Sequence, residues 1–158
     1  MTGRVELVIL IGLQAAGKST FRRELFDATH VVVSKDLMRR NRRPGRRQAQ
    51  LIREALALGR AVVVDNTNAR AEDRLELILL AREHQIPAVG YWVRSSLEES
   101  LLRNSERVGS ARVPDVGVLA TAKAFVRPRR AEGFAELYQV VTDSAWRRTV
   151  SLMSEGDE

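Results

Sequence analysis

The chain has 158 residues, the size of one domain, and 44% of them are hydrophobic, which is enough for a core and excludes a wholly disordered protein. It has no cysteine, so a disulfide framework, a thiolate metal site and a cysteine nucleophile are excluded. No apolar run approaches the roughly 20 residues that span a bilayer, and no secretion signal is recognisable, so we expect a cytoplasmic protein without a membrane partner.

Basic residues outnumber acidic ones, 26 against 20, and only three of the 26 are lysine (Lys18, Lys35 and Lys123). Arginine holds phosphate oxygens with two parallel N–H groups, so this composition is compatible with a polyphosphate or nucleic-acid partner. Codon usage in a GC-rich genome would produce the same bias. Composition by itself does not decide between the two.

Short apolar runs rich in β-branched residues alternate with stretches in which apolar residues recur at helical spacing. In the 71–84 stretch the spacing predicts a helix with Leu75, Ile78 and Leu79 facing inward. In chain order we predict a strand at 5–11, a helix at 18–28, a strand at 30–33, a helix at 48–58, a strand at 61–64, a helix at 71–84, a strand at 87–93, helices at 97–107 and 114–125, and a strand at 137–141.

Strands separated by helices need long crossover connections, which produce a mainly parallel sheet with helices on both faces. We therefore expect a three-layer α/β fold with a mostly parallel, five-stranded sheet. A single domain is expected over residues 1–150, followed by a short acidic tail at 151–158.

The residues after the first predicted strand fit the phosphate-loop pattern G-x-x-x-x-G-K-[ST] in full. Gly12 and Gly17 let the backbone curl so that its N–H groups point at a phosphate, and the next helix adds its positive end. Lys18 is expected to reach the β- and γ-phosphates and Ser19 to offer a hydroxyl to Mg²⁺. This context predicts a P-loop NTPase or kinase fold that binds a nucleoside triphosphate through Gly12, Leu13, Gln14, Ala15, Ala16, Gly17, Lys18, Ser19 and Thr20.

Two charged residues follow the second predicted strand, at the sheet edge that should also carry the phosphate loop. Asp36 can accept the proton of an attacking hydroxyl or orient it, although a helix N-cap is an alternative role. Arg39, three residues later, can hold an anionic group of the acceptor.

Asp65 ends the third predicted strand, where it can contact metal-bound water or orient an arginine, or simply cap the next helix. A glycine-containing link at about 103–114 carries Arg103, Arg107 and Arg112 and is suited to a lid over the triphosphate. Arg107 is the arginine that we expect to reach the transferred group.

Five separated motifs occur in an order that resembles the polynucleotide 5′-hydroxyl kinase family, and the similarity runs from the first strand to about Val141. Because they are separate and ordered, they are more specific than the phosphate loop alone. The motifs are Gly12–Thr20, Lys35-Asp36, Asp65-Asn-Thr-Asn68, Arg103-Asn-Ser-Glu-Arg107 and Val113-Pro114-Asp115-Val116.

The resemblance implies transfer of the γ-phosphate of ATP to the 5′-hydroxyl of DNA or RNA, with Mg²⁺ at Ser19. It implies that Asp36 is the general base and that Arg39 clamps a 3′-phosphate of the acceptor. Lys18 and Arg107 would stabilise the moving phosphoryl group. The remaining implied contacts are with the nucleotide at Arg103 and with the acceptor at Asp65 and Asn68.

The chain also departs from the family. Lys35 stands where arginine or serine is common, and the five arginines between Arg40 and Arg47 match no part of the pattern; they either track a nucleic-acid backbone or form a solvated loop. We expect no attached phosphatase or ligase domain, so a small-molecule kinase of the same fold stays open as an alternative, as does a non-catalytic nucleotide-binding switch. No obligate protein partner is expected.

Overall fold

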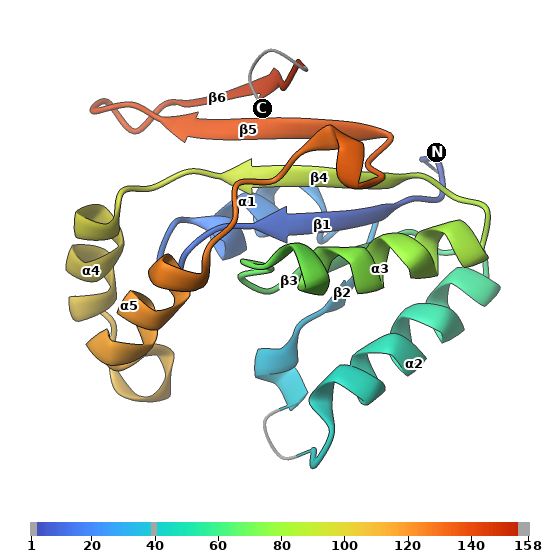
Figure 1. The fold of residues 1–158 in the computed structure, drawn as a ribbon, viewed down its shortest axis with the longest axis horizontal. Coiled ribbons are helices and arrows are strands. Elements are labelled where there is room, and N and C mark those ends of the chain that lie inside the picture. Colours follow the sequence, from blue (N-terminus) through green and yellow to red (C-terminus); the bar gives the residue numbers. More distant parts are fainter. Residues whose placement is uncertain (1–2, 39–40, 155–158) are drawn as a thin grey trace.

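A single mixed sheet forms the centre of the computed structural model, which describes residues 3–38 and 41–154 (Figure 1). Its six strands lie in the order β2-β3-β1-β4-β5-β6. The first five are parallel to one another and β6 runs antiparallel to β5. The strands are β1 (Leu7–Ile11), β2 (Val31–Val33), β3 (Val62–Asp65), β4 (Ala88–Val93), β5 (Glu136–Thr142) and β6 (Arg148–Leu152).

Five α-helices and three short 3₁₀ turns connect the strands within the described ranges. The helices are α1 (Lys18–Leu25), α2 (Pro44–Ala57), α3 (Ala71–Glu83), α4 (Leu97–Ser105) and α5 (Asp115–Ala124). The 3₁₀ turns are η1 (Lys35–Met38), η2 (Gly109–Ala111) and η3 (Arg130–Glu132). None of the helices in this part of the chain has the length and apolar character needed to cross a membrane.

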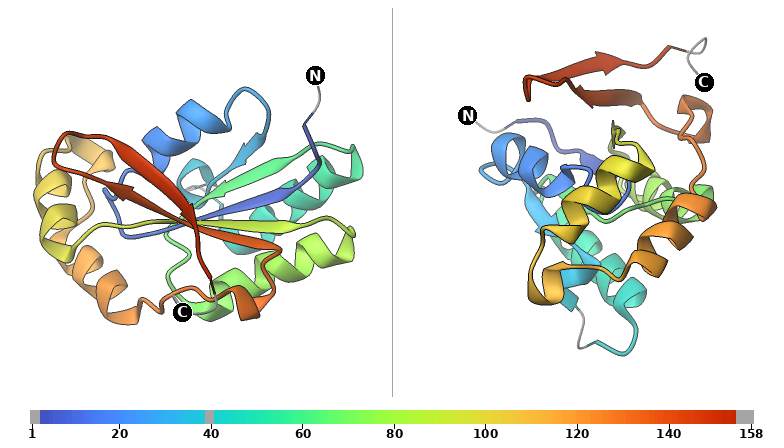
Figure 2. Two further views of the ribbon diagram at one scale, coloured as in Figure 1. Left: turned by 90° about the horizontal axis from the view of Figure 1, so that it is seen from above. Right: turned by 90° about the vertical axis from the view of Figure 1, so that its left-hand side faces the viewer.

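The predicted three-layer α/β fold is confirmed, because helices cover both faces of the sheet (Figure 2). On one face, Phe21 of α1 packs on Val8 and Leu10 of β1. Phe26, the residue after α1, belongs to the same cluster. On the other face, α2 and α3 pack on the alternate side chains of the same strand, among them Leu7 and Ile9. All of β1 is buried, so this strand fixes the position of the loop that follows it.

The C-terminal edge of the sheet differs from the sequence prediction. A sixth strand, β6, pairs with β5 beyond the five strands that were predicted. It runs to Leu152, and Met153 is buried, so these residues belong to the folded edge and not to an acidic tail beginning at residue 151. Most of the β6 side chains are exposed or only partly buried, which explains why the strand has no apolar run to reveal it.

Two helix predictions also need correction. Helix α2 begins at Pro44 and not at residue 48, because proline is well tolerated in the first helical turn and the arginines after it carry no apolar signal. On α3 the inward residues include Leu77 and Ile78, whereas Leu75 and Leu79 are each 48% exposed. The fully buried Arg74 shares the inward face, so a search for apolar spacing alone misplaces that face.

The helices α4 and α5 lie beyond the carboxyl ends of the parallel strands, where β1 and β4 also end (Figure 1). Ligands of open α/β sheets bind at this edge. The loop after β1, the turn η1 after β2 and the turn after β3 all reach the same edge, so the predicted site residues come from neighbouring positions of the sheet.

Candidate functional site

The phosphate loop has the backbone conformation that its sequence predicts. It connects β1 to α1, with positive φ angles of 155° at Gly12, 60° at Ala15 and 105° at Gly17, the N-cap of α1. A Cβ at Gly12 would lie 2.5 Å from the carbonyl oxygen of Val93, so only glycine fits there. The loop backbone is therefore curled at the N-terminus of a helix, as anion binding requires.

Lys18 is buried inside this loop. Its Nζ donates to the carbonyl oxygens of Gly12, at 2.8 Å, and Leu13, at 2.6 Å. Burial lowers the pKa of Lys18 to about 8, while the carboxylates of Asp65 and Asp36 raise it and the guanidinium of Arg107 lowers it. Three predicted site residues, from three different connections, therefore lie close enough to act on the Lys18 charge.

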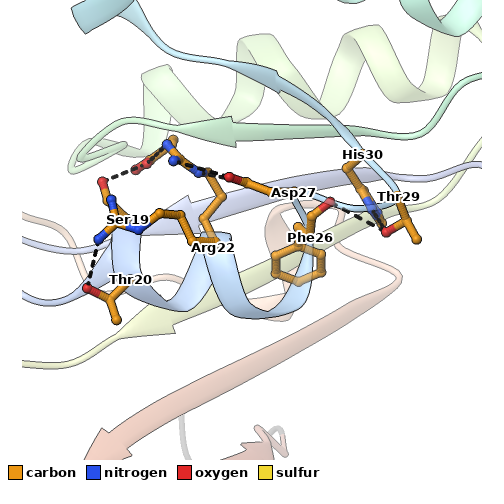
Figure 3. A network of polar contacts seen from close by, with 9 residues as sticks. Ser19, Thr20, Arg22, Phe26, Asp27, Thr29 and His30 are labelled. Atoms are coloured by element: carbon orange, nitrogen blue, oxygen red, sulfur yellow. Dashed lines mark hydrogen bonds and ion pairs between the residues drawn. The ribbon is translucent and has the colours of Figure 1, made fainter.

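Asp65, at the end of β3, is buried and contacts helix α1. Its Oδ2 accepts a hydrogen bond from Ser19 Oγ at 2.8 Å and pairs with Arg22 Nη1 at 2.9 Å. Arg22 also pairs with Asp27 at 2.9 Å, and Figure 3 shows it between Ser19 and Asp27 along α1. Asp65 thus pairs with an arginine, Arg22, which sequence reasoning did not single out.

The turn after β3 fixes the neighbouring connections. Asn66 Oδ1 accepts from the Lys35 backbone N–H at 2.9 Å, and its Nδ2 donates to Gln48 Oε1 at 2.7 Å, which joins η1 to α2. Asn68 was expected to bind substrate, but it is buried and donates from Nδ2 to the Leu10 carbonyl oxygen at 2.7 Å. Its role in this structure is to hold the turn on β1.

The two predicted acceptor residues have different outcomes. Asp36 lies in η1, is exposed, and donates from its backbone N–H to Ser34 Oγ at 3.2 Å. It follows β2 at the carboxyl edge of the sheet, the edge that also carries the phosphate loop, and its charge raises the pKa of Lys18. Arg39 lies outside the described residues, as does Arg40.

The predicted lid is a closed loop between α4 and α5. Asn104, fully buried near the end of α4, donates from Nδ2 to the Val113 carbonyl oxygen at 2.6 Å and accepts from the Val113 N–H at 3.0 Å. This pair clamps the loop that carries Arg107. Arg103, which was predicted to lie in the lid, belongs to α4. Its Nη1 donates to the Ala16 carbonyl oxygen at 3.5 Å, and its Nη2 pairs with Glu99 at 3.2 Å.

A cleft of about 410 Å³ lies between the phosphate loop, α4 and the lid. The turn between β5 and β6 also lines this cleft, and no sequence pattern indicated that turn as part of the site. Trp146 in this turn is 75% exposed. Only the composition gave a signal for it, since it is one of two tryptophans and lies outside every predicted strand and helix. The lining residues are Ala15, Ala16, Gly17, Thr20, Glu24, Val93, Arg103, Arg107, Thr142, Trp146 and Arg148.

The residues around Ser19 fit a magnesium ion. Ser19 Oγ and Asp65 Oδ2 are hard oxygen donors 2.8 Å apart beside the phosphate loop. Over residues 3–38 and 41–154 there is no group of three or more His, Cys, Asp or Glu side chains that could form a protein-only metal site. This suits Mg²⁺, which commonly takes one or two protein oxygens and completes its shell with phosphates and water.

The sequence is similar to two curated proteins named as polynucleotide phosphatase/kinases. The chain is 29% identical over 141 residues to the bifunctional polynucleotide phosphatase/kinase of Schizosaccharomyces pombe, covering 85% of this chain and 33% of that protein. It is 25% identical over 167 residues to the putative bifunctional polynucleotide phosphatase/kinase of Acanthamoeba polyphaga mimivirus, covering 95% and 38%. The chain thus spans between a third and two fifths of the length of these curated relatives.

The fold is shared with solved structures. Chaetomium thermophilum Kti12 in complex with ADP-AlF3 superposes with a TM-score of 0.73 at 16% identity, covering 89% of this chain and 92% of that one. A family model described as an AAA domain matches residues 7–131, which run from β1 through η3 and include the phosphate loop, η1 and the lid. On the basis of this match over most of its length, the chain belongs to that AAA-domain family, AAA_33.

Proposed function

We propose that the protein is an ATP- and Mg²⁺-dependent kinase that transfers the γ-phosphoryl group to a 5′-hydroxyl end of DNA or RNA. The observation that carries this proposal is the meeting of three strand ends at one edge of the sheet. The phosphate loop with the buried Lys18 follows β1, the exposed Asp36 follows β2, and Asp65, which accepts a hydrogen bond from Ser19, ends β3. Nucleotide and Mg²⁺ binding can use Asp65 at the end of the adjacent strand β3, but they need no further exposed carboxylate after β2, where Asp36 lies. The names of the two curated relatives support the choice of a polynucleotide as acceptor.

In this proposal the phosphate loop and Lys18 hold the triphosphate. The curled backbone between Gly12 and Gly17 directs N–H groups at the β-phosphate. Lys18 Nζ, positioned over the loop by the carbonyl oxygens of Gly12 and Leu13, interacts with the β- and γ-phosphates. Burial destabilises the charged form of Lys18. The negative charge of the bound phosphates would stabilise that charged form again.

Ser19 and Asp65 would hold Mg²⁺, directly or through water, and the bound ion would neutralise charge on the phosphate oxygens. Arg22 keeps the Asp65 carboxylate turned towards Ser19. This arrangement positions the ligands before the nucleotide arrives.

Asp36 would accept the proton of the attacking 5′-hydroxyl. It is exposed, so an acceptor can reach it, and it lies close enough to influence Lys18 at the phosphate end of the loop. In the balanced step, the 5′-oxygen forms a bond to the γ-phosphorus, the bond to the β–γ bridging oxygen breaks, and ADP leaves with that electron pair. Arg107 stabilises the negative charge spread over the moving group.

A basic hollow beside η1 supports a polyanionic acceptor over a small neutral one. Its volume is about 480 Å³, and it lies at the start of α2, where the first helical turn has no acidic residue. Its four arginines form no ion pair with any residue of the described ranges. The lining residues are Asn41, Arg42, Arg43, Arg46, Arg47 and Gln50.

These arginines would contact phosphates of a strand whose 5′ end lies at Asp36. Helix α2 and η1 are in contact, and Asn66 joins the two, so the hollow is fixed relative to Asp36. A strand held in this way is recognised by its backbone, which requires no base-specific contacts.

The experiment that tests the proposed function is transfer of label from γ-labelled ATP to a set of acceptors. The set contains 5′-hydroxyl DNA and RNA oligonucleotides, the same oligonucleotides carrying a 5′-phosphate, and small alcohols such as nucleosides. Label is expected on the 5′-hydroxyl oligonucleotides alone. Efficient labelling of the small alcohols without labelling of oligonucleotides would identify a small-molecule kinase, and no transfer to any acceptor would favour a nucleotide-binding switch.

A further inference from the structure

Several hydrogen bonds made by Asp143 hold the turn between β5 and β6 together. The Asp143 carboxylate accepts hydrogen bonds at Oδ1 from the backbone N–H groups of Ala145, at 2.8 Å, and Arg147, at 2.9 Å. Its backbone pairs with Arg147 and Trp146 at 2.9 and 3.0 Å. The backbone at Trp146 therefore belongs to a well-bonded turn.

Trp146, near the end of this turn, is unfavourable for folding in two ways. Trp146 has a φ of 62°, a left-handed conformation in which a bulky side chain is strained and glycine is preferred. Its indole is 75% exposed, so the ring gains little from burial. The fold itself gives no reason for a tryptophan at this position, and strained residues of this kind concentrate at ligand sites.

The indole of Trp146 and the phosphate loop line the same cleft. The indole lines it together with Ala16 and Gly17 of the loop, and with Arg103 of α4. The guanidinium carbon of Arg103 lies 5.6 Å from the centroid of the indole, and its Nη1 donates to the Ala16 carbonyl oxygen. The cleft therefore contains, besides the phosphate loop, two planar groups, one aromatic and one cationic.

We propose that Trp146 and Arg103 form the site for the base of the nucleoside triphosphate, with the indole as a stacking surface. This inference rests on the proposed binding of the triphosphate by the phosphate loop, and it goes further by assigning the opposite end of the nucleotide. A flat indole and a guanidinium plane both pair well with a base, and neither requires a base-specific hydrogen bond. The larger ring of a purine gains more from the stack than a pyrimidine does.

The test compares ATP with inorganic tripolyphosphate, which has the phosphates and no base, in direct binding measurements on the full chain. Trp146→Gly removes the ring and also relieves the left-handed strain, so it is expected to leave the melting temperature unchanged or higher. ATP affinity should fall about 5- to 100-fold, the range that base stacking supports, while tripolyphosphate affinity stays within about twofold. Trp146→Phe, which keeps an aromatic ring, should retain most of the ATP affinity.

An unchanged ATP affinity in Trp146→Gly would overturn the proposal, and so would an equal loss for ATP and tripolyphosphate. Purine triphosphates are expected to bind several-fold more tightly than pyrimidine triphosphates to the unaltered chain, and to lose that advantage in Trp146→Gly. Because no acceptor enters these measurements, a failure of phosphotransfer to oligonucleotides leaves this result intact and the two outcomes are distinguishable.

A spectroscopic measurement provides a second readout. The chain has two tryptophans, and Trp92 is partly buried and packs on Phe125, so Trp92→Phe leaves Trp146 as the only indole. In that background ATP should quench the fluorescence of Trp146 and tripolyphosphate should not. Quenching by neither ligand at saturating concentrations would contradict direct stacking.

Discussion

Gln14 Nε2 donates a hydrogen bond of 2.9 Å to Thr121 Oγ1, and so joins the phosphate loop to α5 across 107 positions of the sequence. The Thr121 hydroxyl in turn donates to the carbonyl oxygen of Gly117 at 3.0 Å. Because α5 follows the lid, this chain of hydrogen bonds fixes the far end of the lid relative to the phosphate loop. The lid is thus anchored at both ends, by Thr121 here and by Asn104 on α4.

Removing the Thr121 hydroxyl tests this anchor. Thr121→Val keeps the shape of the side chain but leaves the Gln14 amide without its acceptor, which should lower the free energy of unfolding by about 1–2 kcal/mol. Thr121→Ser keeps the hydroxyl and serves as the control. Urea unfolding followed by circular dichroism measures both, and equal stabilities of the two variants would show that the hydrogen bond does not contribute.

Asp36→Asn separates chemistry from nucleotide binding. The amide has the size of the carboxylate but cannot accept the proton of a hydroxyl, so kcat for phosphotransfer should fall by about 10²- to 10⁴-fold. The dissociation constant of ATP should change little, because Asp36 is exposed and its carboxylate is the weakest of the charges that act on Lys18. Rapid-quench kinetics and calorimetry measure the two quantities, and a large loss of ATP affinity would place Asp36 in the nucleotide site instead.

The pKa of Lys18 predicts that ATP binding takes up a proton in mildly alkaline solution. Burial lowers this pKa to about 8, so at pH 8.5 most of the free protein carries a neutral Lys18. The triphosphate favours the ammonium form and raises the pKa, so binding at pH 8.5 should take up more than about half a proton, and ATP affinity should weaken as the pH rises above 8. At pH 7 both states are already protonated and this uptake should be small.

Calorimetry in buffers with different heats of ionisation counts these protons. Lys18→Arg is the control, since a guanidinium stays charged throughout this range and should abolish the uptake at pH 8.5. If the unaltered chain takes up the same number of protons at pH 7 and 8.5, then Lys18 does not have the lowered pKa.

The basic hollow predicts a salt-dependent contribution to acceptor binding. In Arg46→Gln/Arg47→Gln, the slope of log(kcat/KM) for a single-stranded oligonucleotide against log[salt] should become shallower by up to about two, roughly one per lost phosphate contact. Arg53→Gln is the matched control on the same helix, because Arg53 is exposed and pairs with Glu83 at 3.3 Å, outside the hollow. Equal slopes in both variants would exclude these arginines from the acceptor path.

The phosphate loop could be read from the sequence because its requirements are local. Gly12 and Gly17 meet backbone demands within a few residues, and Lys18 and Ser19 follow at fixed spacing. The alternation of strands and helices likewise predicted the five parallel strands. Asp36 and Asp65 were singled out because each follows a predicted strand within a few residues, and parallel strands end at the same edge of the sheet.

Features that depend on distant partners could not be predicted in this way. Asn104 has the sequence context of an ordinary helical residue, and only the fold shows it clamping Val113. Asn68 belongs to a recognisable motif, yet its amide supports β1. Trp146 lies in a turn whose place beside the phosphate loop depends on the pairing of β5 with β6, and that strand has no apolar run to mark it.

The most direct measurement of the central claim follows the fate of the γ-phosphoryl group in a single turnover with a 5′-hydroxyl oligonucleotide. Enzyme and γ-labelled ATP are mixed with the acceptor, and the products are digested to find the labelled nucleotide. The account predicts label on the 5′-terminal nucleotide only, with transfer strongly reduced in Asp36→Asn. Release of the label as inorganic phosphate, at a rate that neither the acceptor nor Asp36→Asn alters, would contradict it.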